Sequence, residues 1–178
     1  LLVMGARIGS ISVKGLDVFE KVPQKTILEA LQDSSAVLSI REAFIRVKPS
    51  QLQAFQFDLA KCPSLYLPLI LLAAKAKGTT VLDNVQLLEN QLGADWNAQL
   101  ERLSSFGIKL RIQDKLLLIN GSNENEISRE EILVDKDPFM ILCQVILALN
   151  SDAETSIENI EKIEEVFPSF IADLNSIL

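Results

Sequence analysis

Three segments of the sequence repeat one pattern of apolar and polar positions. A short run that opens on a small residue and carries apolar residues at matching places occupies 9–16, 78–85 and 153–160. After each run, apolar residues recur at spacings of three or four, which is typical of an amphipathic helix. The three apolar stripes are Ile27, Leu28 and Leu31; Trp96, Leu100, Leu103 and Phe106; and Phe170, Ile171, Leu174 and Leu178. The pattern predicts three units, each with a strand followed by a helix.

The first two units continue into segments that alternate between apolar and polar residues. One runs from 38 to 47 through Arg41-Glu42, and the other runs from 108 to 119 with a turn at Gln113-Asp114. Alternation of this kind predicts β-hairpins in a sheet with one buried face and one solvated face. The third unit ends at its helix without such a hairpin.

Two further segments are apolar on nearly every side and predict buried helices. They span about 64–77 and 138–149, and short strands at 55–58 and 132–134 precede them. Pro68 should kink the first of these helices or lie in its first turns. Both are too short to span a bilayer.

The complete unit is therefore strand, buried helix, strand, amphipathic helix, strand, strand. Only the second unit, at about 54–120, is complete; the first covers about 1–50, with Leu1–Ala6 as the end of its buried helix, and the third covers 131–178. We expect an α/β (α+β) fold, incomplete at both ends, with helices inside and mixed sheets outside. We expect residues 1–178 to form one domain.

Composition and charge narrow the possible functions. The net charge of −7 argues against a nucleic-acid partner, because phosphate contacts need clustered Lys and Arg. The chain has no histidine, which excludes an imidazole base and a His-ligated metal within it. We interpret the late acidic residues as a solvated face: Glu124, Glu126, Glu130, Glu131, Glu158, Glu161, Glu164 and Glu165.

The two cysteines suggest a reducing compartment. Cys62 and Cys143 are too few to cross-link a fold of this size, so we expect buried free thiols and, from them, a cytoplasmic location. No span reaches the roughly 18 apolar residues of a membrane helix, and we expect no membrane partner.

Three stretches of the sequence resemble the enolpyruvyl transferases, specifically the family of 3-phosphoshikimate 1-carboxyvinyltransferase (EPSP synthase). Residues 57–65 with 71–80 are similar to the family's D-L-x-x-C-P-D and L-A-A-x-A-x-G-T-T segments. Residues 165–170 with Leu174 are similar to its closing K-x-F-P-D-F, and 13–16 with 27–31 to the strand and helix that open the domain.

The resemblance implies a fold and partners. Family members have two domains of three βαβαββ units, and the C-terminal domain takes its last strands from the N-terminus of the polypeptide. This chain is then a C-terminal domain that is inactive without its N-terminal domain. The implied substrates are phosphoenolpyruvate and shikimate 3-phosphate, with no cofactor and no metal.

The resemblance also assigns the family's functional positions to residues of this chain. Its base, directly after Cys-Pro, corresponds to Ser64, and its Lys-Glu and Arg before the amphipathic helix fall near Asn90, Gln91, Leu92 and Asp95. Its Asp-His-Arg corresponds to Asp137, Pro138 and Phe139, its late Lys to Glu165, and its Gln-Gly-Asp to Val22-Pro23-Gln24, between Lys21 and Lys25. At Asp137, Pro138 and Phe139 the His and Arg are replaced, and the other positions also depart from the family pattern.

The remaining candidates each have a structural alternative. Lys136 either contacts an anion at the N-terminus of the second buried helix or is a surface lysine. Ser64 and Gln91 are candidates for hydrogen bonds to a substrate. For Ser64 the structural alternative is a helix cap, and Asp95 is also read as a helix cap. Trp96 is read as core, and residues 120–123 as a turn-rich loop.

Two functions remain open from the sequence. One is enolpyruvyl transfer to shikimate 3-phosphate in aromatic amino-acid biosynthesis. The alternative is a degenerate relative that keeps the scaffold as a binding or structural protein. A third reading, an RNA 3′-terminal phosphate cyclase on the same repeat, is disfavoured by the acidic charge.

Overall fold

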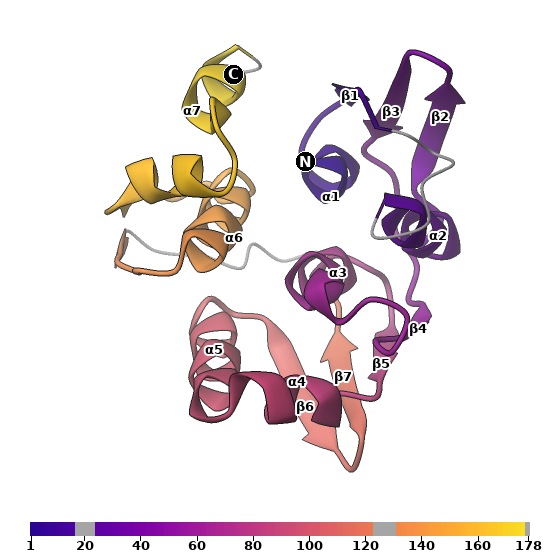
Figure 1. Ribbon diagram of the computed structural model, residues 1–178, viewed down its shortest axis with the longest axis vertical. Coiled ribbons are helices and arrows are strands. Elements are labelled where there is room, and N and C mark those ends of the chain that lie inside the picture. Colours follow the sequence, from indigo (N-terminus) through magenta and orange to yellow (C-terminus); the bar gives the residue numbers. More distant parts are fainter. Residues whose placement is uncertain (17–23, 123–130, 177–178) are drawn as a thin grey trace. The chain divides into compact units, whose positions relative to one another are not determined.

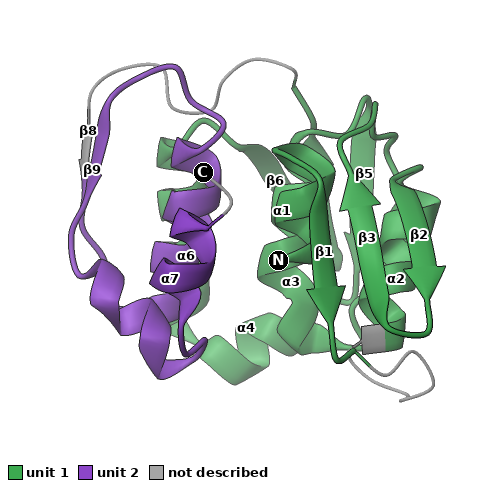
Figure 2. Cartoon of the chain, turned by 90° about the horizontal axis from the view of Figure 1, so that it is seen from above, with its two compact units in different colours: residues 1–124 green, residues 125–178 purple. Residues whose placement is uncertain are grey.

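The computed structural model describes residues 1–16, 24–122 and 131–176. Contacts within the chain divide it into two compact units, Leu1–Glu124 and Asn125–Leu178, coloured separately in Figure 2. The predictions that fall on Lys21, Val22 and Pro23, and on residues 123–130 and 177–178, lie outside the described residues.

The described elements follow the order that the repeat predicts (Figure 1). The first unit contains α1 (Leu2–Arg7), β1 (Ile11–Lys14), α2 (Gln24–Asp33), β2 (Val37–Arg41), β3 (Phe44–Lys48), β4 (Gln56–Asp58), η1 (Pro63–Leu65), α3 (Tyr66–Ala74), β5 (Thr79–Asp83), α4 (Gln86–Leu92), α5 (Ala94–Ser105), β6 (Lys109–Gln113) and β7 (Leu116–Asn120). The second contains β8 (Glu131–Leu133), α6 (Pro138–Ala148), β9 (Thr155–Ile157), η2 (Ile160–Glu165) and α7 (Phe170–Asn175).

Both predicted hairpins are confirmed, and the two sheets of the first unit share one topology. Sheet A has the strand order β1-β3-β2, and sheet C has the order β4-β5-β7-β6. All neighbours are antiparallel except β4 and β5, which are parallel. The order β1-β3-β2 in sheet A matches β5-β7-β6 in sheet C, so the two sheets are built from equivalent strands of a repeat.

The backbone supports the repeat at one further position. Gly15, Asn84 and Asn159 occupy equivalent places after the strands β1, β5 and β9, and all three have positive φ, at 76°, 63° and 57°. Gly adopts this left-handed conformation at the lowest cost, and Asn is among the few other residue types that tolerate it. The residue types at this position therefore follow from a turn that the three sequence repeats share.

Helices α1 and α3 form the inside of the first unit. Helix α1 packs on β1, on β3 and on α3, while α3 packs on β7. Seven of the nine residues of α3 are buried, which confirms the predicted apolar helix, and Pro68 lies in its first turn rather than at a kink. The Gly5 Cα approaches β3 so closely that a Cβ would lie 3.2 Å from the Val47 Cβ.

A buried arginine joins the two inner helices. Arg7, at the end of α1, is 9% exposed, and its Nη1 donates to the carbonyl oxygen of Leu71. That carbonyl belongs to the last four of α3, which have no partner within the helix. The guanidinium therefore caps α3 and places a positive charge where the helix dipole is negative.

The amphipathic helix of the second repeat is confirmed, but it has an unpredicted neighbour. Trp96, Leu100 and Leu103 of α5 are buried, and Trp96 meets Tyr66 edge to face at 5.8 Å, which confirms Trp96 as core. The segment 86–92, for which no helix was predicted, forms the helix α4, which buries Leu88. Gly93 separates the two helices with a φ of 57°.

The second unit is a smaller version of the same design. Strands β8 and β9 are parallel, like β4 and β5, and α6 packs against η2. Helix α6 is buried along most of its length, as predicted, but Phe139 in its first turn is 53% exposed. Cys143 on this helix, and Cys62 in the first unit, are buried free thiols, as predicted.

No helix within the described residues is long and apolar enough to cross a membrane.

Candidate functional site

The residues that sequence reasoning singled out follow the carboxyl ends of the two parallel strand pairs. Ser64 follows β4, while Gln91 and Asp95 follow β5. Because β4 and β5 are parallel and adjacent, the chain leaves both strands at one edge of sheet C, which we call the first edge (residues 58–65 and 83–95). Lys136, Pro138, Phe139 and Glu165 follow β8 and β9 in the same way, at a second edge (residues 134–139 and 158–165).

At the first edge, an asparagine joins the chain after β4 to the chain after β5. The Asn84 Nδ2 donates to the Asp58 Oδ1 at 2.7 Å, and the amide of Ala60 donates to the same oxygen at 2.8 Å. The amide of Leu59 also donates to the Asp83 carbonyl at 3.1 Å. The hydrogen bond from Asn84, then that from Ala60, lowers the pKa of Asp58, and burial opposes this only in part.

The position of Ser64 is not that of a helix cap. Ser64 lies inside the 3₁₀ turn η1, and the residues that precede η1 and α3 are Cys62 and Leu65, neither of which makes a side-chain cap. The Ser64 Oγ lies 3.3 Å from the buried Cys62 Sγ, and the residue is exposed. The residue is therefore accessible to solvent just before α3, while its hydroxyl contacts the Cys62 thiol.

Gln91 and Asp95 are also exposed, on two different helices. Gln91 is in the last turn of α4, and Asp95 is the second residue of α5. The expectation that Asp95 caps α5 is wrong, because Gly93 occupies the cap position and no side chain accepts a hydrogen bond there. Asp95 still lies in the first turn of α5, where a carboxylate interacts favourably with the helix dipole.

At the second edge, the same kind of link joins the chain after β8 to the chain after β9. The Asn159 Nδ2 donates to the Asp135 carbonyl oxygen at 2.8 Å. The Asp135 carboxylate is 3% exposed and accepts from the amides of Lys136 at 2.6 Å and Asp137 at 2.9 Å. Hydrogen bonds from the Asn159 side chain to the Asp135 carbonyl, and from two backbone amides to the Asp135 carboxylate, therefore fix the loop that carries the candidate residues.

The N-terminus of α6 is capped by Asp137. Its Oδ1 accepts from the Phe139 amide at 2.9 Å, and Pro138 occupies the first turn, where its missing N–H costs nothing. A capping carboxylate neutralises the positive end of the helix dipole, so this terminus is a poor site for a further anion. Lys136 is exposed directly before it.

Glu165 lies at the end of η2 and is exposed. With Glu158, Glu161 and Glu164, it forms the described part of the acidic face, and all four are exposed as predicted. For Glu131, only the backbone is described. Of the first repeat's candidates, only residues from Gln24 onward are described, and Lys25 is exposed on α2.

The chemistry available at the two edges is mainly hydrogen bonding. Among the candidate residues, the exposed groups are a hydroxyl at Ser64, an amide at Gln91, an ammonium at Lys136 and carboxylates at Asp95 and Glu165. No group of three or more His, Cys, Asp or Glu that could hold a metal ion occurs within the described ranges. The hydroxyl, amide and ammonium can orient a polar or anionic ligand, and a hydroxyl at Ser64 is a weaker base than a carboxylate.

Sequence reasoning missed the two linking asparagines and their acidic partners. The available signal was the repeat itself, because Gly15, Asn84 and Asn159 align at a position where only residues tolerant of positive φ recur. That signal would have found the turn. The partners Asp58 and Asp135 depend on which strands are neighbours, which the pattern alone does not give.

Comparison with known proteins shows one family over nearly the whole chain. The sequence model of EPSP synthase (3-phosphoshikimate 1-carboxyvinyltransferase) matches residues 2–174. Two curated proteins named 3-phosphoshikimate 1-carboxyvinyltransferase are similar: one from Methanococcus vannielii is 25% identical over 179 residues, and one from Pyrococcus furiosus is 27% identical over 177. Each alignment covers 99% of this chain, with 41% and 43% of the relatives.

Solved structures agree on the fold. An EPSP synthase from Acinetobacter baumannii superposes with a TM-score of 0.78 at 17% identity, over 98% of this chain and 43% of that one. The enolpyruvyl transferase NikO from Streptomyces tendae gives a TM-score of 0.72 at 14% identity, over 98% and 40%. The chain thus spans about two fifths of the length of the proteins it matches.

Proposed function

Because the chain belongs to the EPSP synthase (3-phosphoshikimate 1-carboxyvinyltransferase) family, we propose that it is part of an enzyme that transfers the enolpyruvyl group of phosphoenolpyruvate to shikimate 3-phosphate. The observation that carries the proposal is the family match over residues 2–174, together with a complete βαβαββ unit in β4–β7. Both compact units then belong to one domain. The enzyme serves aromatic amino-acid synthesis, and we place it in the cytoplasm.

The reaction defines what the site must supply. A ring hydroxyl of shikimate 3-phosphate adds to C2 of phosphoenolpyruvate, its proton passes to a base, and the methylene carbon receives a proton. The tetrahedral adduct then loses a proton from that carbon and expels inorganic phosphate. Such a site needs cations for two carboxylates and two phosphates, and at least one group that both accepts and returns a proton.

We assign substrate binding to the exposed polar groups of the two edges. At the first edge, the Ser64 hydroxyl and the Gln91 amide offer neutral hydrogen bonds to ring hydroxyls. At the second edge, Lys136 offers one positive charge to a phosphate or carboxylate. The exposure of all three side chains, at the carboxyl ends of parallel strands where α/β proteins usually bind ligands, supports the assignment.

This chain supplies too little positive charge for the whole reaction, and a hydroxyl, Ser64, stands where the resemblance places the family's base. Asp137 caps α6 and is not free for proton transfer, while Pro138, Phe139 and Glu165 replace basic positions of the family. We therefore propose that the base and most of the cations come from the part of the polypeptide that corresponds to the remaining three fifths of the relatives. This part includes an N-terminal domain.

The relatives' names do not favour the alternative of a binding or structural protein without the chemistry. Complementation tests the proposal in cells. A bacterium that lacks its own EPSP synthase should grow without aromatic amino acids when it expresses this chain joined to its N-terminal domain. A variant with Lys136→Glu in the same protein should slow growth, because it weakens anion binding. Failure to grow, with the protein present and folded, would count against the proposal.

A further inference from the structure

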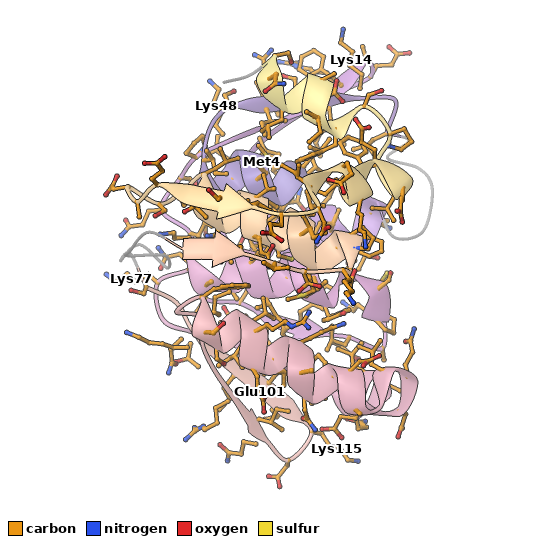
Figure 3. The ribbon with its side chains drawn as sticks, turned by 90° about the vertical axis from the view of Figure 1, so that its left-hand side faces the viewer. Met4, Lys14, Lys48, Lys77, Glu101 and Lys115 are labelled. Atoms are coloured by element: carbon orange, nitrogen blue, oxygen red, sulfur yellow. The ribbon has the colours of Figure 1, made fainter. Side chains whose placement is uncertain are left out.

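One face of sheet A is positively charged, although the chain as a whole is acidic. All four cations on this face are exposed, and in Figure 3 Lys14 and Lys48 project outward while Met4 of α1 lies inside. We call this surface the basic face. The strand register places on it, opposite α1, the eight side chains of Ser12, Lys14, Val37, Ser39, Arg41, Phe44, Arg46 and Lys48, none of which is acidic.

The charge of the basic face is not a consequence of the repeated fold. Sheet C contains equivalent strands in the same order, and its register gives the residues that correspond to the four cations: Asp83, Gln113, Leu118 and Asn120. None of these is a cation, and one is an acid. The same strands can therefore be built without the four charges, which repel one another on sheet A. An anionic partner would relieve that repulsion.

Arg46 is preorganised at the centre of the basic face. Its Nε donates to the Ser12 Oγ at 2.8 Å, and its guanidinium carbon lies 5.1 Å from the centre of the Phe44 ring. These two contacts use the Nε and the flat side of the guanidinium. They leave the Nη1 and Nη2 atoms for a bidentate hydrogen bond to a carboxylate, which is the geometry that arginine favours.

The cations lie in rows whose spacing selects the shape of the partner. Lys14 and Arg41 flank Phe44 in one row across the sheet, Arg46 lies in the next row, and Lys48 lies in the third. Alternate residues of a strand are about 6.7 Å apart, and so are these rows. An extended peptide spaces the side chains on one of its sides by the same distance. Acidic side chains at every second residue would therefore meet one row each.

We propose that the basic face binds an extended acidic segment of a partner protein, with Asp or Glu at alternate positions. A single-stranded nucleic acid fits less well, because such strands are held by bases that stack on open aromatic rings. Phe44 is the one aromatic residue on this face, and the Arg46 guanidinium already covers it. The net charge of −7 on the chain also opposes a nucleic acid. The proposal does not depend on the catalytic function.

NMR titration of the isotope-labelled chain tests the proposal with a synthetic peptide of about ten residues that carries three glutamates at alternate positions among threonines. We expect the peptide to shift the amide signals of β1, β2 and β3. Binding should weaken as salt rises from about 0.02 M to about 0.2 M, because the contact is electrostatic. A peptide of the same composition with glutamates at every third position should bind about fivefold more weakly, since its acids point to opposite sides of an extended chain.

Arg46→Gln with Lys48→Gln should weaken binding of the alternating peptide about tenfold. Arg111→Gln with Lys115→Gln is the matched control, because it removes the same charge from sheet C and should leave the affinity unchanged. Thermal melts verify folding, and Lys14→Gln with Arg41→Gln replaces the first variant if that variant melts early.

Several results would overturn the proposal. One is a titration in which the signals of sheet A do not move. Equal affinity for the two peptides would reject the match in spacing, and a basic-face variant that keeps its affinity would reject the assignment to these residues. Tighter binding of a single-stranded RNA, or of vesicles of anionic lipid, than of the alternating peptide would show that the partner is not an acidic protein segment.

Discussion

Gly121 lies where the end of β7 meets the end of α3, and replacing it by alanine should be strongly destabilising. A Cβ at this position would lie 1.7 Å from the Ala76 carbonyl oxygen and 2.7 Å from that of Ala73. Real Cβ atoms essentially never come within 3.0 Å of another heavy atom. The chain must therefore move by more than 1 Å, on the order of the gap between these two values, and both obstructing atoms belong to backbone that cannot rotate away.

The cost follows from what such a movement breaks. The Gly121 amide donates to the Gly78 carbonyl at 3.0 Å, and the Ser122 amide donates to the Ala74 carbonyl at 2.9 Å. Losing both costs about 2 kcal/mol, and strain in the surrounding backbone adds about 1–2 kcal/mol. We expect a loss of about 3–4 kcal/mol in the free energy of unfolding. For a chain of this size, the melting temperature should fall by about 10 °C.

Urea denaturation followed by circular dichroism measures the effect, and Gly9→Ala is the matched control. No heavy atom lies within 4 Å of a Cβ built at Gly9, and its φ is not in the left-handed region. Alanine there should leave stability unchanged or raise it by up to about 1 kcal/mol, because it restricts the unfolded chain. If Gly121→Ala lost less than about 1 kcal/mol, the close approach of β7 to α3 would be wrong.

Three further substitutions test the links described above. Asn84→Ala should raise the pKa of Asp58 toward 3.8, its ordinary value, and carboxyl NMR titration measures the change. Because the pKa of Asp58 is lowered in the folded state, the stability that this carboxylate contributes is present above about pH 4 and is lost as the pH falls further. Arg7→Met should cost about 2–3 kcal/mol by uncapping α3, measured by chemical denaturation, with retention of wild-type stability contradicting the cap. Ser64→Ala should change stability by less than about 0.5 kcal/mol yet lower kcat/KM of the complete enzyme about tenfold, the loss of one neutral hydrogen bond; unchanged kcat/KM would remove Ser64 from the site.

The sequence was most informative where local chemistry decides the structure. Alternation in 108–119 predicted β6 and β7 because one face of that hairpin is buried, and the apolar runs predicted α3 and α6 because both helices are buried over most of their surface. Asp137 was read from the family pattern as an inherited position, whereas its role in the structure is to cap α6.

The sequence was least informative where tertiary contacts override the local preference of the chain. The resemblance placed family positions near residues 90–95, before the amphipathic helix, and predicted no helix there, yet residues 86–92 form α4, which buries Leu88. Helix α5 begins at Ala94 with Gly93 in the cap position, so Asp95 lies inside its first turn rather than at the cap. Phe139 was expected inside an all-buried helix, but the first turn of α6 leaves it 53% exposed.

The location of the candidate site could be predicted from the sequence, but the hydrogen bonds that join its segments could not. The family pattern placed Ser64 after β4 and Gln91 after β5, and the parallel pairing of those strands makes the chain leave both at one edge of sheet C. The hydrogen bond from Asn84 to Asp58 joins residues 26 apart in the sequence, and nothing in the periodicity specifies that pairing. Long-range polar links of this kind require knowledge of the strand order.

The most direct test of the account is phosphate release by this chain joined to its N-terminal domain. The account predicts that inorganic phosphate appears only when phosphoenolpyruvate and shikimate 3-phosphate are both present, with one enolpyruvyl product formed for each phosphate. Phosphate release that does not require shikimate 3-phosphate, or none at all from a folded protein that binds both substrates, would contradict it.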